Sequence, residues 1–188
     1  MRFKPPPSQE SKIGWRVEFR PLDIQLTDFE NTCLIVLMGL LTNVVNHFDV
    51  NFILPITLSD INMERAHKRD AVLNQKFWFN KNCVTSEEYW KSELQNSDYL
   101  ISSKKDYVEP EYVEYTISEI LIGQEGTQFK GIYPVIKKFM ELKEYKSEHV
   151  QQIEHILNFL LARAKGDIPT GAKFIREVIA KSEFYNHD

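Results

Sequence analysis

The sequence predicts an α+β protein that is predominantly helical, with one or two antiparallel strands near its amino-terminal end. Three observations support this fold class. Residues 15–20 alternate between apolar and charged side chains, as in a strand with one buried face. Thr27 and Thr116 each precede a Glu by three residues, which is the capping-box pattern of a helix start. Apolar residues recur at helical spacing through residues 148–181.

The composition is that of an ordinary globular domain. The 188 residues suffice for one domain with a core, and 43% are hydrophobic while 27% are charged. The net charge of -4 argues against a nucleic-acid partner that is bound through bulk positive charge. Two cysteines, Cys33 and Cys83, make no disulfide framework, so we expect a buried thiol at Cys33 and a reducing, cytoplasmic setting.

The longest apolar run, residues 33–41, is the one candidate membrane segment in the sequence. It ends at Thr42, well short of the about 20 apolar residues that span a bilayer. A buried core helix is therefore expected, and no membrane partner. Residues 1–7 contain no apolar core of the signal-peptide type, which predicts no secretion.

The strand over residues 13–20 places Arg16, Glu18 and Arg20 on one face. A carboxylate between two guanidinium groups can hold a divalent cation and bind polyanionic oxygens. If residues 1–4 form a neighbouring strand across the polar, proline-rich loop, Arg2 joins this face, and the surface suits a nucleoside triphosphate with magnesium. The alternative is an exposed strand face with cross-strand ion pairs, which is the more frequent meaning of such a pattern.

The next elements are helices. The first begins near Asp28 and reaches about His47. The second, capped by Ser59 or Asp60, covers residues 61–75 and has an inward set of four side chains: Met63, Ala66, Ala71 and Val72. Residues 77–79 are aromatic and fit a strand or a turn equally. Residues 80–112 are predicted to form a variable surface loop. The acidic residues 109–114 are interpreted as solvated surface rather than a cation site.

The rest of the chain is predicted to be helical. A short helix opens after Thr116 and stops at Gly123, and further helices cover residues 132–144 and 148–165, the latter ended by Gly166. Thr170 caps a last helix over residues 171–181. Its expected inward side chains are Ala172, Ile175, Val178 and Ile179. The sequence contains no glycine-rich phosphate loop and no paired-cysteine zinc motif.

Several segments resemble the catalytic subunit of eukaryotic glutamate–cysteine ligase (gamma-glutamylcysteine synthetase). The most specific lie in the first 31 residues, at positions 2–6, 14–21 and 25–31. Weaker likeness continues at residues 62–63, 66–71, 163–166 and 172–176, so the resemblance covers about the whole chain and is weakest across residues 80–112.

The resemblance implies that residues 1–188 are a carboxyl-terminal portion of a single ligase catalytic domain with a glutamine synthetase-like fold. Residues 1–21 would supply active-site strands and residues 22–188 a mainly helical part. Such ligases join the γ-carboxyl of L-glutamate to the amine of L-cysteine, with ATP and Mg²⁺, through γ-glutamyl phosphate, as the first step of glutathione synthesis. The acidic pairs and substrate pockets of the family would lie outside this chain, which is therefore expected to be inactive alone.

The same resemblance assigns roles to three residues. Glu18 matches a carboxylate that binds magnesium, Arg20 a catalytic arginine on the ATP phosphates, and Arg2 a second basic group near the nucleotide. Animal members of the family pair with a regulatory modifier subunit, which is a further expected partner. The alternative function is a non-catalytic helical module for protein interaction.

Overall fold

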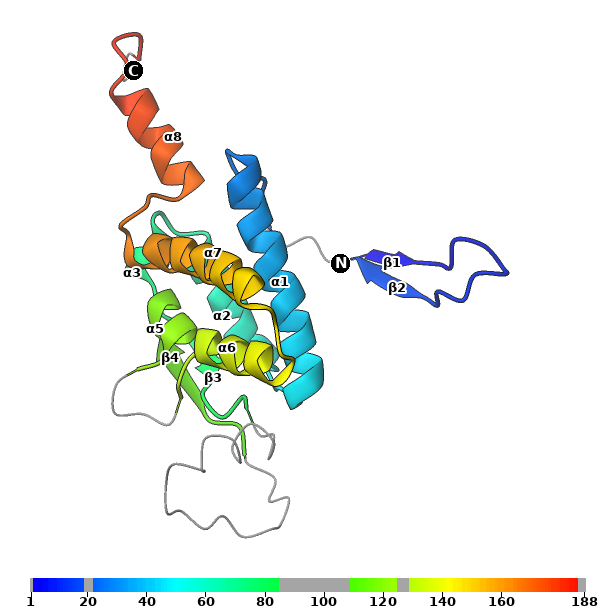
Figure 1. The fold of residues 1–188 in the computed structure, drawn as a ribbon. Coiled ribbons are helices and arrows are strands. Elements are labelled where there is room, and N and C mark those ends of the chain that lie inside the picture. Colours follow the sequence, from blue (N-terminus) through cyan, green and yellow to red (C-terminus); the bar gives the residue numbers. More distant parts are fainter. Residues whose placement is uncertain (1, 19–21, 85–108, 125–128, 186–188) are drawn as a thin grey trace.

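A computed structural model of the chain describes residues 2–18, 22–84, 109–124 and 129–185. It is mainly helical, with two small antiparallel sheets, as Figure 1 shows. The elements, in chain order, are β1 (Arg2–Lys4), β2 (Arg16–Glu18), α1 (Asp28–Phe48), α2 (Ile56–Ala66), α3 (Ala71–Asn74), β3 (Phe77–Asn80), β4 (Tyr112–Tyr115), α5 (Ile117–Ile122), α6 (Ile132–Leu142), α7 (Ser147–Lys165) and α8 (Gly171–Ala180).

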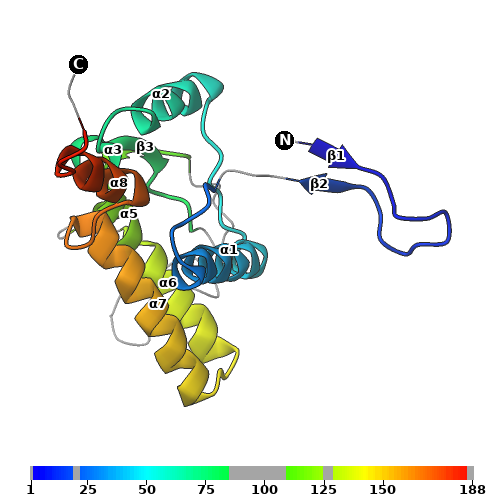
Figure 2. The same ribbon diagram turned by 90° about the horizontal axis from the view of Figure 1, so that it is seen from above.

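The core lies where α1 packs against α6 and α7, with α5 beside the last two. Figure 2 shows these helices on one side of the molecule, away from the β1–β2 hairpin. Phe48, Ile136, Met140 and Leu157 are among the largest fully buried side chains. Leu157 lies within residues 148–181, where apolar residues recur at helical spacing.

Helix α1 begins and ends as the sequence predicts. The Thr27 side chain accepts a hydrogen bond from the Glu30 backbone amide, and the Glu30 carboxylate accepts one from the Thr27 backbone amide. Asp49 closes the helix in the left-handed conformation. By length and composition alone, α1 could cross a membrane, a criterion that core helices of soluble proteins also meet. Its expected burial is confirmed on one face, which holds Cys33 and Phe48, whereas Ile35 is 68% exposed.

The single helix expected at residues 61–75 is wrong in its bounds. Helix α2 starts at Ile56 directly after Pro55, and Asp70, at a φ of 52°, separates it from α3. Aspartate tolerates this left-handed backbone, which a continuous helix excludes. The expected inward positions of Met63 and Ala66 are also wrong, since Met63 is 56% exposed and Ala66 is exposed too, whereas Ala71 is buried.

Residues 77–79, for which the sequence fitted a strand or a turn equally, form a strand of a second sheet. Strand β3 pairs antiparallel with β4, with Phe77 opposite Tyr115. The Asn62 side chain of α2 accepts from the backbone amide of Trp78 at 2.8 Å and donates to its carbonyl at 2.9 Å. The described residues thus contain four strands in two pairs, where the sequence predicted one or two strands. Strands β3 and β4 were not predicted because the two partners lie far apart in the sequence.

Helix α8 starts after the Thr170 cap, as predicted, but its expected inward face is wrong. Ile175, Val178 and Ile179 are 46%, 53% and 44% exposed, because α8 extends beyond the helical core (Figure 1) and no described element covers that face. A pair between Arg176 and Asp70, at 2.9 Å, ties α8 to the start of α3.

Candidate functional site

The two amino-terminal strands pair as the sequence predicts. Strand β1 runs antiparallel to β2, with Arg2 opposite Glu18 and Lys4 opposite Arg16. Residues directly opposite each other in an antiparallel pair lie on the same face of the sheet. The backbone register therefore brings these four positions to one face of the hairpin. The hairpin stands apart from the helices in both ribbon views (Figures 1 and 2).

Among the described side chains of this face, Lys4 and Glu18 form an ion pair, and Arg16 bonds to the backbone. Lys4 Nζ lies 2.8 Å from Glu18 Oε2, and the Glu18 side chain is 22% exposed. The Arg16 guanidinium donates to the carbonyl of Pro5 at 3.3 Å. Arg20, the predicted phosphate-binding arginine, lies outside the described residues, and for Arg2 only the backbone position is described. Lys4 shares a face with Arg2 in an extended strand, as the sequence interpretation expected, but that interpretation gave Lys4 no role beside Glu18.

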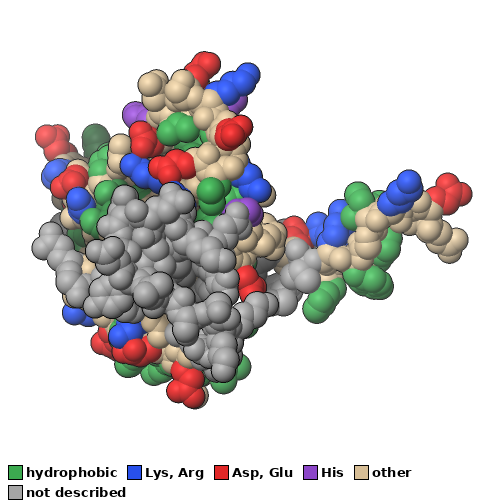
Figure 3. All heavy atoms as spheres, turned by 60° about the horizontal axis from the view of Figure 1, so that its bottom comes forward, with side chains coloured by type: hydrophobic (Ala, Val, Ile, Leu, Met, Phe, Trp, Pro, Cys, Tyr) green, Lys and Arg blue, Asp and Glu red, His purple; other side chains and the backbone are tan. Residues whose placement is uncertain are grey.

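The other face of the hairpin is apolar and uncovered. Phe3 is 69% exposed, Trp15 72% and Ile13 53%. Figure 3 shows uncovered hydrophobic side chains beside basic ones on the hairpin, at the right of the view. An isolated two-stranded hairpin is at best marginally stable in water. The apolar face of this hairpin is thus uncovered among the described residues.

Glu18 fits a magnesium ion as a ligand but cannot hold one alone. Mg²⁺ prefers oxygen ligands in octahedral geometry, often one or two carboxylates with phosphate oxygens and water. Across the described ranges, no group of three or more His, Cys, Asp or Glu side chains could hold a metal. A metal site at Glu18 would therefore require oxygen ligands beyond those of the described residues.

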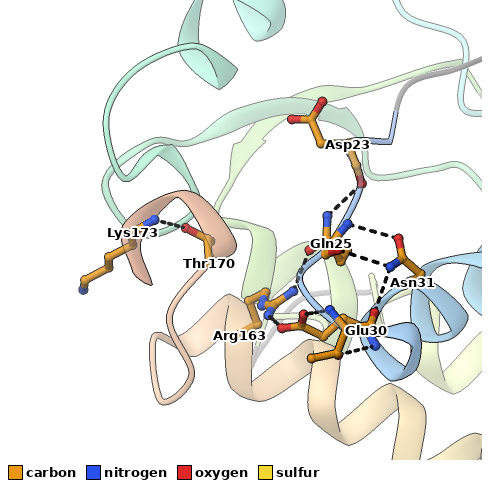
Figure 4. A network of polar contacts seen from close by, with 8 residues as sticks. Asp23, Gln25, Glu30, Asn31, Arg163, Thr170 and Lys173 are labelled. Carbon is orange, nitrogen blue, oxygen red and sulfur yellow. Dashed lines mark hydrogen bonds and ion pairs between the residues drawn. The ribbon is translucent and has the colours of Figure 1, made fainter. Parts of the chain in front are cut away.

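A second polar cluster joins the start of α1 to the end of α7 (Figure 4). Arg163 Nη1 donates to Gln25 Oε1 at 3.0 Å, and Nη2 makes a short ion pair with Glu30. The side chains of Arg163 and Glu30 are only 12% and 13% exposed. The sequence interpretation missed this cluster. Its one signal was that residues 25–31 and 163–166 both belong to segments that carry the family resemblance.

The Glu30 carboxylate is held in its charged form. Burial acts to raise its pKa, but the hydrogen bonds from Arg163 and from Thr27 outweigh burial, and the pKa of Glu30 lies below its usual range. One oxygen accepts from Arg163 and the other from the Thr27 amide at 3.0 Å. The capping box and the ion pair thus share one carboxylate.

The thiols of the two cysteines are buried, and their raised pKa values disfavour the reactive thiolate form. Cys33 is 0% exposed and Cys83 1%, which confirms the expected buried thiol at Cys33. Burial raises the pKa of Cys33 and raises that of Cys83 to about 12. Because the thiolate is the reactive form, neither thiol suits nucleophilic chemistry near neutral pH.

A groove of about 380 Å³ lies between α6 and α7. Its charged lining side chains include Lys137 and Glu154, which pair at 2.9 Å, and Lys138 and Glu141, which pair at 3.4 Å. The charges lining the groove are thus largely neutralised by each other, and they do not form a cluster of one sign for a charged ligand.

Comparison with known proteins decides the family. The family model for glutamate-cysteine ligase matches residues 1–188. The chain belongs to the glutamate–cysteine ligase family. Glutamate–cysteine ligase of Dictyostelium discoideum is 35% identical over 188 residues, which are 100% of this chain and 27% of that protein. The glutamate–cysteine ligase catalytic subunit of Homo sapiens is 39% identical over 191 residues, covering 100% of this chain and 29% of the relative.

This glutamate–cysteine ligase segment therefore spans little more than a quarter of its curated relatives, as the shares of 27% and 29% show. That span agrees with the expectation that the chain corresponds to one portion of a longer ligase. The segment resembling the family includes both the β1–β2 hairpin and the Arg163 cluster, since the match extends over every residue.

Proposed function

We propose that this chain is part of an ATP-dependent glutamate–cysteine ligase, in which the β1–β2 hairpin forms one wall of the MgATP site. The family match over residues 1–188 carries this proposal. The hairpin register supports the site, because it sets Arg2 opposite Glu18 and groups basic positions around one carboxylate. The uncovered apolar face fits a hairpin that joins a larger antiparallel sheet of the glutamine synthetase type.

The proposed reaction has two steps. A γ-carboxylate oxygen of L-glutamate bonds to the γ-phosphorus of ATP as the bond to the ADP oxygen breaks, which gives γ-glutamyl phosphate. The amine nitrogen of L-cysteine then bonds to the acyl carbon and loses a proton, and phosphate leaves with the electron pair. The phosphorylation is needed because a free carboxylate is a poor electrophile. Protein groups contribute mainly by positioning and by charge stabilisation.

The roles proposed within this chain concern the nucleotide. Glu18 would ligate a magnesium ion, and Arg20 and Arg2 would bind phosphate oxygens; bound magnesium neutralises phosphate charge during transfer. Lys4, 2.8 Å from Glu18, balances the charge of this carboxylate when no metal is there. If Glu18 ligates magnesium, its charge would be neutralised there, and Lys4 would be available to bind a phosphate oxygen.

The remaining parts of the ligase lie outside the described hairpin. One carboxylate does not complete a magnesium site, so we expect the 188-residue chain alone to form no γ-glutamylcysteine. A regulatory modifier subunit is a proposed partner by family membership. A cytoplasmic location is proposed because both cysteines are free and buried, as suits a reducing compartment.

The test of the site is a pair of substitutions in a complete ligase that contains this sequence. Glu18→Gln and Arg20→Ala should each abolish turnover while the melting temperature stays near that of the parent protein. Glu10→Gln, which alters an exposed carboxylate in the loop of the same hairpin, is the matched control and should retain activity. Full turnover in both the Glu18 and the Arg20 variants would refute the assignment.

A second candidate function rests on α8, whose apolar face is exposed at Ile175, Val178 and Ile179. Such a face fits a non-catalytic module that binds another protein. Nucleotide binding separates the two functions, because a ligand that binds only the folded state raises the melting temperature. A rise with MgATP, abolished in Glu18→Gln, favours the ligase; no rise in the complete protein favours the interaction module.

A further inference from the structure

Lys4 contacts Glu18 diagonally across the β1–β2 hairpin. It lies directly opposite Arg16, two positions along β1 from Arg2, which faces Glu18. Diagonal neighbours in an antiparallel pair lie about 7–8 Å apart, a distance that a long side chain can cross. The Lys4 ammonium crosses it and lies 2.8 Å from Glu18 Oε2. The Lys4 side chain is 41% exposed, so it is more accessible to a ligand than the carboxylate that it contacts.

The second described cation of this face bonds elsewhere. The Arg16 guanidinium donates to the Pro5 carbonyl at 3.3 Å, in the loop that joins the two strands. Among the described side chains of the face, Lys4 is therefore the cation that pairs with Glu18. A lysine ammonium is a point charge on a flexible four-carbon stem, so it can change partners, whereas a guanidinium binds through a rigid fork.

The Lys4–Glu18 pair opposes a metal ion at the same carboxylate. A magnesium ligand oxygen lies about 2.1 Å from the ion. If Lys4 stayed at 2.8 Å from the Glu18 oxygen, its ammonium would be repelled at short range by two positive charges. A phosphate oxygen of the nucleotide offers the same ammonium a charge-assisted hydrogen bond instead. The ion pair thus disfavours a metal ion alone, and the phosphate contact favours a metal ion with nucleotide.

We propose that Lys4 couples the binding of magnesium to the binding of nucleotide in the ligase. In the free enzyme Lys4 pairs with Glu18 and competes with a divalent cation. In the loaded enzyme it binds a phosphate oxygen. Two ligands that are coupled in this way raise each other's affinity by the same factor. This inference rests on the proposed function of the hairpin, and it gives Lys4 the role of selecting the metal–nucleotide complex over the metal alone.

Two substitutions in the complete ligase test this inference. Lys4→Met removes the ammonium at similar length, and Lys4→Arg keeps the charge. The dissociation constant of Mn²⁺, which takes the same oxygen ligands as Mg²⁺, is measured on the nucleotide-free protein by electron paramagnetic resonance. The dissociation constant of the magnesium complex of adenylyl imidodiphosphate, an ATP analogue that resists hydrolysis, is measured by calorimetry.

The expected shifts in Lys4→Met have opposite signs. Mn²⁺ should bind about two- to fivefold more tightly, because a partly exposed ion pair no longer competes. The nucleotide complex should bind about tenfold more weakly, as expected for losing a hydrogen bond to a charged group. Lys4→Arg should keep the nucleotide constant within about threefold, since a guanidinium also binds phosphate. A purely structural role of Lys4 would weaken both ligands or neither.

Lys12→Met changes an exposed lysine in the loop of the same hairpin and is the matched control, with both constants expected to stay parental. In Lys4→Met, any pattern other than tighter Mn²⁺ with weaker nucleotide overturns the inference, as does the lack of measurable Mn²⁺ binding in both parent and variant. A loss of nucleotide affinity in Lys4→Arg as large as that in Lys4→Met also overturns it.

Glu18→Gln separates this inference from the proposed function. If Glu18→Gln weakens both ligands while Lys4→Met keeps the parental constants, the coupling through Lys4 alone is refuted. If Glu18→Gln itself keeps the parental constants for Mn²⁺ and nucleotide, the proposed site is refuted, whatever Lys4→Met shows.

Discussion

The Glu30–Arg163 pair allows a quantitative test of the structure through the single substitution Glu30→Gln. Glutamine can still close the capping box at this helix position, so the change removes mainly the charge. Because both side chains of the pair are nearly buried, at 12% and 13% exposed, Arg163 would be left as a charge without its counter-ion. Leaving such a charge buried costs about 3 kcal/mol, near the lower end for broken buried pairs.

The direction of the Glu30 pKa shift determines how the difference in unfolding free energy depends on pH. The pKa of Glu30 is lowered in the folded protein, because hydrogen bonds from Arg163 and Thr27 outweigh burial. The carboxylate therefore adds stability above the ordinary pKa of 4.5, and this stability is lost as the pH falls through the lower folded value. The difference in unfolding free energy between parent and Glu30→Gln should be full at pH 7 and shrink below about pH 4.5.

Urea unfolding followed by circular dichroism, at several pH values from neutral to acid, measures this difference. Glu141→Gln is the control, because Glu141 is 69% exposed and its pair with Lys138 is worth at most about 1 kcal/mol. Equal stability of Glu30→Gln and the parent at pH 7 would show that the pair contributes nothing. A difference that grows toward acid pH would contradict the assigned direction of the Glu30 pKa.

Three further outcomes are expected. Phe48→Ala should lower the unfolding free energy by about 3–5 kcal/mol in urea titrations, because Phe48 is 0% exposed in the core, and a cost below 1 kcal/mol would count against that packing. Gly131→Ala should abolish the cooperative thermal transition or lower its midpoint strongly. The reason is that a Cβ at residue 131, where φ is +90°, would overlap the backbone of Gly123. An unchanged midpoint would contradict this close approach. Cys83, whose pKa is raised to about 12 by burial, should react with a thiol reagent at pH 8 only after denaturation, and rapid labelling of the native chain would disprove its burial.

Local signals in the sequence were sufficient for the helices whose ends carry their own chemistry. The capping boxes at Thr27 and Thr116 and the stop at Gly166 lie within a few residues of the elements that they bound, so α1, α5 and α7 begin or end as predicted. Strands β3 and β4 were harder to predict. Their partners are more than 30 residues apart along the chain, and pairing at that distance is decided by tertiary contacts.

In the candidate site, too, some features follow from the local sequence and others depend on tertiary contacts. Alternation within residues 15–20 predicted the second strand, and its pairing with residues 1–4 was only a condition for the shared charged face. The Lys4–Glu18 contact depends on a register that only the structure gives. Arg163 could not be placed beside Glu30 from spacing, because the two are 133 residues apart. For α8, the pattern showed which face is apolar but not whether any other element covers it.

The uncovered Trp15 on the hairpin makes any covering of the apolar face visible to spectroscopy. An indole that is 72% exposed emits as a water-solvated fluorophore and is open to collisional quenchers such as iodide. When a complementary stretch of ligase polypeptide covers the apolar face, the emission should move to shorter wavelength and quenching should fall. Among the three tryptophans of the chain, residue 15 thus offers a label-free optical reporter of polypeptide that covers this face, without any change to the charged face opposite.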